Sequence, residues 1–161
     1  MAKILLFDWG NTIMVDYGFP GPMYRWEKID WMPNADKALK TLSNLHPCYL
    51  ATNAGLSDST LVLKALSRVG ADLFFSGIFT STDLGVEKPD PEFFRAICDH
   101  LRVLPGDCIM IGDHYVKDIT GARQFGMKTV WLNHKKHNGD FPMADRIIHS
   151  MDELPEIIRT L

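Results

Sequence analysis

Short apolar runs alternate along the chain with segments in which apolar residues recur at the helical period. The runs predict buried strands and the periodic segments predict amphipathic helices. The strands are expected at 4–7, 48–51, 77–80, 108–111, 128–132 and 146–149, and the helices at 35–45, 58–69, 91–102, 116–125 and 152–161. This alternation is typical of an α/β fold with a parallel sheet covered by helices on both faces.

Residues that favour helix N-termini precede three of these helices. Asn34 or Pro33 precedes the first, Ser57-Asp58 stands at the start of the second, and Asp90 stands before Pro91 at the start of the third. Asn and Asp side chains accept hydrogen bonds from the free backbone N–H groups of a first turn, and proline fits that turn. We therefore expect these residues to cap their helices.

An irregular stretch follows the first predicted strand. Residues 13–33 are rich in glycine, proline and large side chains, and they predict a loop or flap. Its large side chains could cover a site or contact another subunit, or they could pack on the core of their own domain. They are Tyr17, Phe19, Met23, Tyr24, Trp26 and Trp31.

Length and composition limit the class of protein. At about 150 residues per domain, a chain of 161 residues is expected to form a single domain over positions 1–161. Its 46% hydrophobic and 23% charged residues are typical of a soluble globular protein. The net charge of −3 argues against a general binder of nucleic acids or of anionic membranes.

Cysteine usage and hydropathy indicate the compartment. Cys48, Cys98 and Cys108 lie in apolar stretches without the close pairing of zinc sites or small disulfide scaffolds. They fit buried, reduced thiols. No apolar run is long enough for a signal-peptide core or a membrane span, and we therefore expect a cytoplasmic protein.

Polar residues stand where the predicted strands end. They are Asp8, Thr52 and Asn53 after the first two strands, Lys88 shortly before a helix, and Asp113 with Asp118 after the fourth strand. Open parallel sheets bind ligands at the carboxyl ends of their strands. Each residue alone could equally occupy a turn, cap a helix or lie in solvent. Their order along the chain indicates a common site.

This ordered set resembles the motifs of the haloacid dehalogenase-like hydrolases, and the resemblance extends from position 4 to about position 132. It implies a three-layer, doubly wound, Rossmann-like sheet, mostly parallel. The segments between Asp8 and Thr52 and between Lys88 and Asp113 are too short for a cap domain, so the resemblance is to the capless type. The site would then be open to solvent unless the flap or a second subunit of a homo-oligomer covers it.

The resemblance also implies roles for the site residues. Asp8 would attack phosphorus to form an aspartyl-phosphate, with its other oxygen on Mg²⁺. Asp113 and the backbone carbonyl of Gly10 would bind the same ion. Asp118 would lie behind the direct metal ligands and would act through a water or by orienting Lys88.

These residue types suit phosphoryl transfer on physical grounds. A carboxylate that attacks a phosphate meets a repulsion of about 4 kcal/mol for each pair of charges at about 4 Å near a protein surface. Lys88 supplies a compact cation, and Asp8 with Asp113 can hold Mg²⁺, which prefers carboxylates, water and phosphate. Donors on Thr52 and Asn53 can bind the phosphate oxygens in the transition state. The predicted site comprises the catalytic residues Asp8, Thr52, Lys88 and Asp118, the phosphate ligands Thr52, Asn53 and Lys88, and the metal ligands Asp8, Gly10 and Asp113.

One position departs from the pattern of the family's phosphatases. They usually carry a second Asp two residues after the nucleophile, as the general acid and then the base, and here that residue is Gly10. General acid–base catalysis contributes about 10²–10⁴-fold in rate. The substrate could have a leaving group that needs no acid, Asp16 or His114 could substitute, or the protein could bind with little turnover. For His114, a loop histidine without a catalytic role is the favoured interpretation. Asn11 also stands where glycine is usual.

The sequence therefore predicts a Mg²⁺-dependent phosphohydrolase that acts through an aspartyl-phosphate on an unidentified phosphorylated substrate. The alternative is a regulatory module that binds phosphate and metal with low turnover, because Gly10 replaces the usual acid. Dehalogenation is less favoured. A halide leaving group needs no Mg²⁺, whereas the chain keeps the acidic pair Asp113 and Asp118 that a metal site requires.

Overall fold

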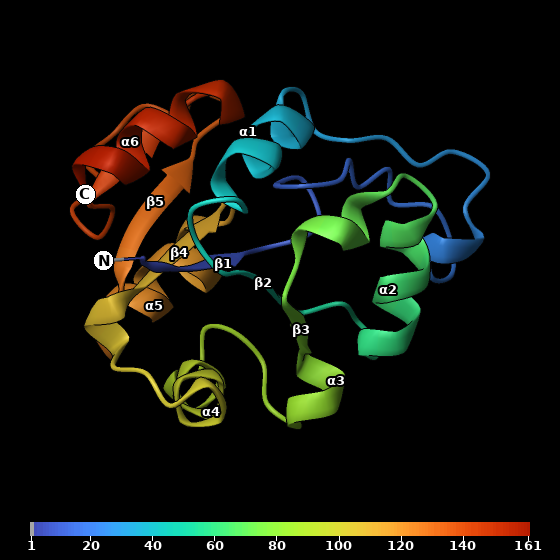
Figure 1. Ribbon diagram of the computed structural model, residues 1–161, viewed down its shortest axis with the longest axis horizontal. Coiled ribbons are helices and arrows are strands. Elements are labelled where there is room, and N and C mark those ends of the chain that lie inside the picture. Colours follow the sequence, from blue (N-terminus) through green and yellow to red (C-terminus); the bar gives the residue numbers. More distant parts are fainter. Residues whose placement is uncertain (1) are drawn as a thin grey trace.

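A computed structural model describes residues 2–161, which form one six-stranded sheet in the order β3-β2-β1-β4-β5-β6 (Figure 1). All neighbouring strands pair in parallel. The strands are β1 (Ile4–Phe7), β2 (Cys48–Thr52), β3 (Gly77–Thr80), β4 (Cys108–Gly112), β5 (Lys128–Leu132) and β6 (Arg146–Ile148). Each predicted strand is confirmed to within one residue at either end.

The helices cover both faces of the sheet. On one face, α1 (Ala35–Leu42), α2 (Ser59–Ser67) and α6 (Leu154–Thr160) share a hydrophobic cluster with the strands. On the other face, α4 (Pro91–Leu101) and α5 (Gly121–Phe125) build a second cluster, and the short α3 (Ser81–Leu84), which the sequence did not predict, borders it. The molecule thus has the predicted three-layer, doubly wound arrangement, and residues 2–161 form no separate cap domain.

The position of β1 in the middle of the sheet explains why its sequence is apolar throughout. Leu5 and Phe7 of β1 point into the cluster under α1, and Leu6 between them points into the cluster under α4. All three side chains are fully buried. A strand buried on both faces has no polar face, which is why it appears as a continuous apolar run rather than an alternating one.

Two of the three predicted helix caps are confirmed. The side chains of Asp58 and Asp90 accept hydrogen bonds from the first turns of α2 and α4, and Pro91 occupies the first turn of α4. The prediction at Asn34 is wrong. Its backbone adopts a left-handed conformation with φ of 64°, and its side-chain amide donates to the Ser150 hydroxyl instead of capping α1.

The helix predicted at 116–125 consists of two parts. Residues Tyr115–Thr120 form a π-helical turn, and α5 continues from it. Such turns are rare overall but frequent at functional sites. The thiols of Cys48, Cys98 and Cys108 are buried and free, as predicted. No helix in the described part of the chain combines the length and the apolar character needed to cross a membrane.

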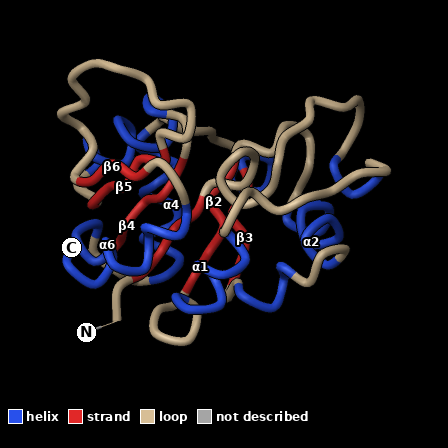
Figure 2. The backbone as a smooth tube through the Cα atoms, turned by 90° about the horizontal axis from the view of Figure 1, so that it is seen from above, coloured by secondary structure: helices blue, strands red, loops and turns tan. Residues whose placement is uncertain are grey.

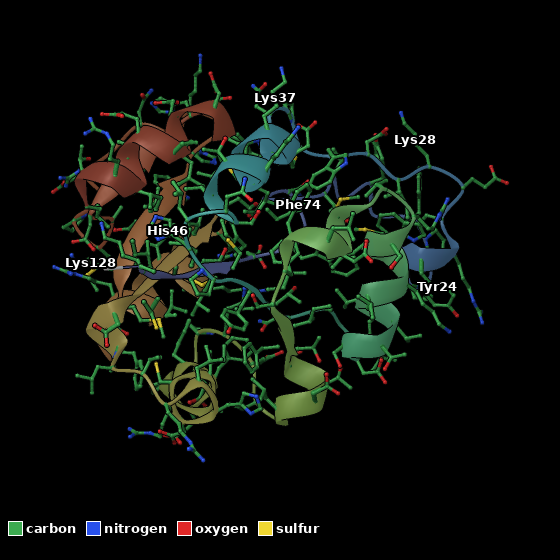
Figure 3. The ribbon with its side chains drawn as sticks, in the orientation of Figure 1. Tyr24, Lys28, Lys37, His46, Phe74 and Lys128 are labelled. Carbon is green, nitrogen blue, oxygen red and sulfur yellow. The ribbon has the colours of Figure 1, made fainter. Side chains whose placement is uncertain are left out.

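The segment 13–33 packs on the domain itself. Met23, Trp26 and Met32 are buried in the cluster under α1 and α2. The Arg68 guanidinium at the end of α2 donates to the backbone carbonyls of Tyr24 and Trp26. Figure 3 shows Tyr24 beside α2, and Lys28 pointing away from the molecule. The local-core interpretation of these large side chains therefore holds for the buried ones.

The longer loops gather at the end of the sheet opposite the N-terminus (Figure 2). Because β1 begins near the N-terminus and all strands are parallel, this is the end at which the strands' carboxyl termini meet. The fold thus places the segments that follow β1, β2 and β4 together.

Helix α5 approaches the segment before α4 so closely that position 121 has room only for glycine. A Cβ on Gly121 would lie 2.9 Å from both the Cβ and the carbonyl oxygen of Pro89, and 3.0 Å from the ring of Phe94. Since overpacking typically costs about 1–3 kcal/mol, we expect Gly121→Val to lower the free energy of unfolding by that amount in urea denaturation. Gly106→Val is the matched control, because a Cβ there meets nothing within 4 Å. Equal losses in the two variants would contradict this account of the packing.

Candidate active site

A cavity of about 380 Å³ opens at the carboxyl ends of β1, β2 and β4. Every site residue that the sequence predicted lines it: Asp8, Gly10, Thr52, Asn53, Lys88, Asp113 and Asp118. The register explains this convergence. Phe7 at the end of β1 pairs with Leu50 and with Ile111, and the Asp8 backbone N–H donates to the Ile111 carbonyl at 2.9 Å. The strands thus end at nearly one level, so their following residues meet.

The Lys88 ammonium lies at the centre of the site. Its Nζ is 2.6 Å from Asp118 Oδ1, 2.9 Å from Asp8 Oδ1 and 2.7 Å from the Ala51 carbonyl oxygen. The side chain is only 2% exposed. Burial opposes its charge, but the Asp118 and Asp8 carboxylates outweigh that cost and hold the pKa of Lys88 above its ordinary value. Lys88 therefore remains a cation, with an acceptor for each of its three protons.

The side chain of Asn53 holds the backbone of Lys88. Its Nδ2 donates to the Lys88 carbonyl at 2.8 Å, and its Oδ1 accepts the Lys88 N–H at 2.9 Å. The peptide bond that follows, Lys88-Pro89, is cis. The sequence predicted Asn53 as a phosphate ligand through side-chain or backbone donors. In the structure its side-chain hydrogen bonds position Lys88.

Glycine at position 112 allows Asp118 to fold back onto the end of β4. A Cβ on Gly112 would overlap the Asp118 carboxyl group. The π-helical turn carries Asp118 to this place, where its Oδ2 accepts the backbone N–H of His114 at 3.0 Å. Both oxygens of the buried Asp118 are thus occupied, one by Lys88 and one by this N–H. The resemblance implied that Asp118 could orient Lys88, and the 2.6 Å contact is the geometry which that role requires.

Three carboxylates converge beside the lysine. Oxygens of Asp8, Asp113 and Asp118 lie within 4.8 Å of one another. Burial, with the charges of Asp8 and Asp118 added, raises the pKa of Asp113 to about 7. Burial and the Asp8 charge also raise the pKa of Asp118 to about 6, although Lys88 opposes them. One ammonium therefore does not compensate the whole cluster, and a further cation would be favourable there.

The donor set fits a hard divalent ion. Asp8 and Asp113 are the partly exposed members of the cluster, whereas Asp118 is buried with both oxygens in use. Oxygen ligands at this spacing are those that Mg²⁺ prefers. Gly10 lines the same cavity. Asp8 and Asp113 are therefore the side chains that could hold such an ion.

Two supporting residues were missed by the sequence analysis. The hydroxyl of the fully buried Thr12 donates to Asp113 Oδ1 at 3.2 Å, and the indole N–H of Trp131 donates to the Asp113 carbonyl at 2.9 Å. Both fix Asp113 from behind. Neither residue type marks such a role in a sequence, because each is equally common in an ordinary core. His114 caps the π-helical turn, with its Nδ1 accepting the Lys117 N–H.

The flap supplies one wall of the cavity. Met23 and Trp26, which are buried in the domain core, also line the cavity together with Gly21 and Pro22. Asp16 lies at the same edge. Side chains of the flap thus pack in the domain core and also line the cavity. Packing on the core and covering the site, the two interpretations of its large side chains, therefore do not exclude each other.

Comparisons with known proteins identify the family of this chain. A family profile described as haloacid dehalogenase-like hydrolase matches residues 22–126. The glyceraldehyde 3-phosphate phosphatase of Pyrococcus furiosus is 35% identical over 99 residues, which are 61% of this chain and 41% of that protein. The N-acylneuraminate-9-phosphatase of Rattus norvegicus is 38% identical over 93 residues, which are 55% of this chain and 37% of that protein. The chain thus spans about two fifths of the length of these relatives.

Solved structures share the fold. A HAD phosphatase from Thermococcus onnurineus matches with a TM-score of 0.81 at 22% identity, over 97% of both chains. A 2-haloacid dehalogenase from Pseudomonas syringae matches with a TM-score of 0.77 at 19% identity, over 99% of both chains. At these identities the structures establish the fold alone. The family profile, however, covers well over half of the sequence, including Thr52, Lys88 and Asp113. The chain therefore belongs to the haloacid dehalogenase-like hydrolases.

Proposed function

We propose that this protein is a Mg²⁺-dependent phosphohydrolase in which Asp8 attacks the phosphorus of its substrate and forms an aspartyl-phosphate. The observation that carries the proposal is the buried Lys88 ammonium, 2.9 Å from Asp8 Oδ1. A fixed cation beside the attacking carboxylate lowers the repulsion between it and an anionic phosphate. The phosphatase names of the partial relatives support a phosphorylated compound as the substrate class.

The reaction would begin at the exposed side of the Asp8 carboxylate. Its side chain is 14% exposed, at the floor of the cavity, whereas the partner lysine is buried behind it. The ion pair fixes the orientation of the Asp8 carboxylate toward an incoming phosphate. Thr52 at the end of β2 lines the cavity and would donate its hydroxyl to a phosphate oxygen. The substrate would thus meet a preorganised nucleophile with donors beside it.

The metal would complete the charge balance. Asp8 and Asp113 would hold Mg²⁺, with the Gly10 carbonyl as a further ligand, and the ion would act as a Lewis acid on the phosphate. The raised pKa of Asp113, which burial and then the charges of Asp8 and Asp118 cause, supports this assignment, since a bound cation would offset both effects. Thr12 keeps the Asp113 carboxyl group in place for the ion.

Gly10 favours a second candidate, a module that binds phosphate and metal with little turnover. Residue 10 offers no proton for the leaving group. The two candidates share one binding site and differ in turnover. A substrate with a good leaving group separates them, because its hydrolysis does not depend on an acid.

We expect wild-type protein with Mg²⁺ to release phosphate from acetyl phosphate and from 4-nitrophenyl phosphate. Asp8→Asn should lower this rate by at least about 10³-fold, because the amide cannot act as the nucleophile. Colorimetric phosphate release measures the effect, and circular dichroism checks the fold. The matched control Asp140→Asn changes an exposed loop carboxylate and should keep the wild-type rate. Release that is absent from wild type, or unchanged in Asp8→Asn, would favour the binding module.

Thermal unfolding tests the metal site without reference to turnover. At a Mg²⁺ concentration about 100 times Kd, binding stabilises by about 2.7 kcal/mol, or about 5–10 °C in Tm for a chain of this size. Asp113→Asn should lose this rise in Tm, whereas Asp140→Asn should keep it.

The same variant should be more stable than wild type in metal-free buffer at pH 8. The folded-state pKa of Asp113 is raised to about 7, so ionised Asp113 costs stability as pH rises through that value. Asn removes this cost and can still accept the Thr12 hydrogen bond. Asp113→Asn that keeps the full Mg²⁺ shift would exclude Asp113 as the ligand described here. A variant that is less stable than wild type at pH 8 would contradict the cost assigned to ionised Asp113.

A further inference from the structure

The space beside Gly10 is filled by another carboxylate. A Cβ on Gly10 would lie 3.4 Å from Asp16 Cβ and 3.5 Å from Asp16 Oδ2. Gly10 forms a parallel β-bridge with Met14, so the chain makes a complete turn between these two residues before it reaches Asp16. Both Gly10 and Asp16 line the cavity that contains Asp8. The Asp16 carboxyl group therefore stands where a side chain at position 10 would otherwise project.

Two hydrogen bonds fix Asp16, one at its carboxyl group and one at its backbone. The Gly18 N–H donates to Asp16 Oδ1 at 2.8 Å, and the Asp16 N–H donates to Asn11 Oδ1 at 2.9 Å. Asn11 has φ of 56°, a left-handed conformation that Asn adopts more readily than most residues. Within residues 2–161, Asp16 Oδ2 has no hydrogen-bond partner. One oxygen is thus fixed, and the other is free for a ligand in the cavity.

Most other titratable groups that line the cavity are already engaged. Lys88 and Asp118 form the buried ion pair, and Asp113 faces the candidate metal position. His114 uses Nδ1 to cap the π-helical turn, which leaves Nε2 as the rival proton carrier. Asp16 differs from His114 in the position of its free oxygen, which lies beside Gly10, two residues after the nucleophile Asp8.

We propose that Asp16 is the general acid and base of this chain's phosphoryl transfer, in the place of the side chain that Gly10 lacks. The proposal deepens the proposed function and rests on Asp8 forming an aspartyl-phosphate. It predicts hydrolysis of alkyl phosphates, whose leaving groups need a proton, in addition to activated phosphates.

The two half-reactions balance with water as the only co-reactant. In the first, an Asp8 oxygen bonds to phosphorus while the bond from phosphorus to the leaving oxygen breaks, and protonated Asp16 gives its proton to that oxygen. In the second, ionised Asp16 takes a proton from water as the water oxygen bonds to phosphorus. The bond from phosphorus to Asp8 then breaks, phosphate leaves, and Asp16 is protonated again.

The test compares leaving groups in wild type and Asp16→Asn. For glycerol 1-phosphate, an alkyl ester, kcat/KM should fall by about 10²–10⁴-fold, the usual contribution of a general acid. For 4-nitrophenyl phosphate it should fall by less than about 10-fold, since this leaving group departs without a proton. A merely structural role of Asp16 would lower both values alike. Asp140→Asn should change neither.

A second set of variants, in which the carboxyl group moves from position 16 to position 10, keeps the test decisive if Asp16→Asn disturbs the turn. Gly10→Asp alone would set two carboxylates against each other, because the new Cβ lies 3.5 Å from Asp16 Oδ2. The informative pair is Asp16→Ala and Gly10→Asp/Asp16→Ala. The double variant should recover at least about 10-fold of the alkyl phosphate activity that Asp16→Ala loses.

His114→Asn tests the rival residue, since Asn can still cap the π-helical turn. A leaving-group-dependent loss in this variant, with none in Asp16→Asn, would overturn the proposal. Equal losses for both substrates in Asp16→Asn, without recovery in the double variant, would overturn it while leaving the proposed function intact. Wild-type protein without turnover dependent on Asp8 and Mg²⁺ would overturn both.

Discussion

The buried ammonium of Lys88 is the interaction on which the site depends. It joins Asp8, which follows β1, the Ala51 carbonyl in β2, and Asp118 in the turn after β4. Removing one member of a buried ion pair typically costs about 3–5 kcal/mol, because the remaining charge is left without compensation. The strand ends are therefore coupled through one cation. The same contact that holds the elements together also orients the carboxylate beside the cavity.

Several features of the chain serve to bring this cation to its place. Asn53 holds the Lys88 backbone through two hydrogen bonds. The absence of a side chain at Gly121 lets the segment after Lys88 pack against α5, and the absence of one at Gly112 leaves room for the Asp118 carboxyl group. The two glycines and the side chain of Asn53 act on the positions of the charged groups. They determine whether the charged groups meet at hydrogen-bond distance or a few ångströms apart, a difference that strongly affects the rate of a positioned reaction.

The sheet could be predicted from the sequence because its central strands are buried on both faces. Continuous apolar runs such as Ile4–Phe7 and Cys108–Gly112 pack best in the middle of a sheet that helices cover on both faces. Helix ends were less certain. Asp58 caps its helix as predicted, whereas Asn34 adopts a left-handed backbone and bonds to Ser150, a partner far away in the sequence. A local pattern contains no information about such a distant partner.

The members of the site could be predicted from the sequence, but their contacts could not. The order of polar residues at the strand ends was sufficient to group them, since parallel strands in register bring their carboxyl ends together. The partners of each residue could not be read in this way. The side chain of Asn53 turns to the Lys88 backbone, and Thr12 supports Asp113, through contacts that depend on how loops fold over the sheet. Sequence order identifies which residues meet, and only the structure shows what each one touches.

The loop after β1 shows how a missing side chain can be compensated within a fold. What a proton transfer requires is a carboxyl group at the right point in space, and the position of its residue in the sequence is secondary. The left-handed turn at Asn11 and the bridge between Gly10 and Met14 return the chain to the mouth of the cavity. Asp16 consequently reaches the space beside Gly10, with one oxygen held by Gly18. A carboxyl group at position 10 would compete with Asp16 for this space, so glycine at position 10 and aspartate at position 16 form one consistent arrangement.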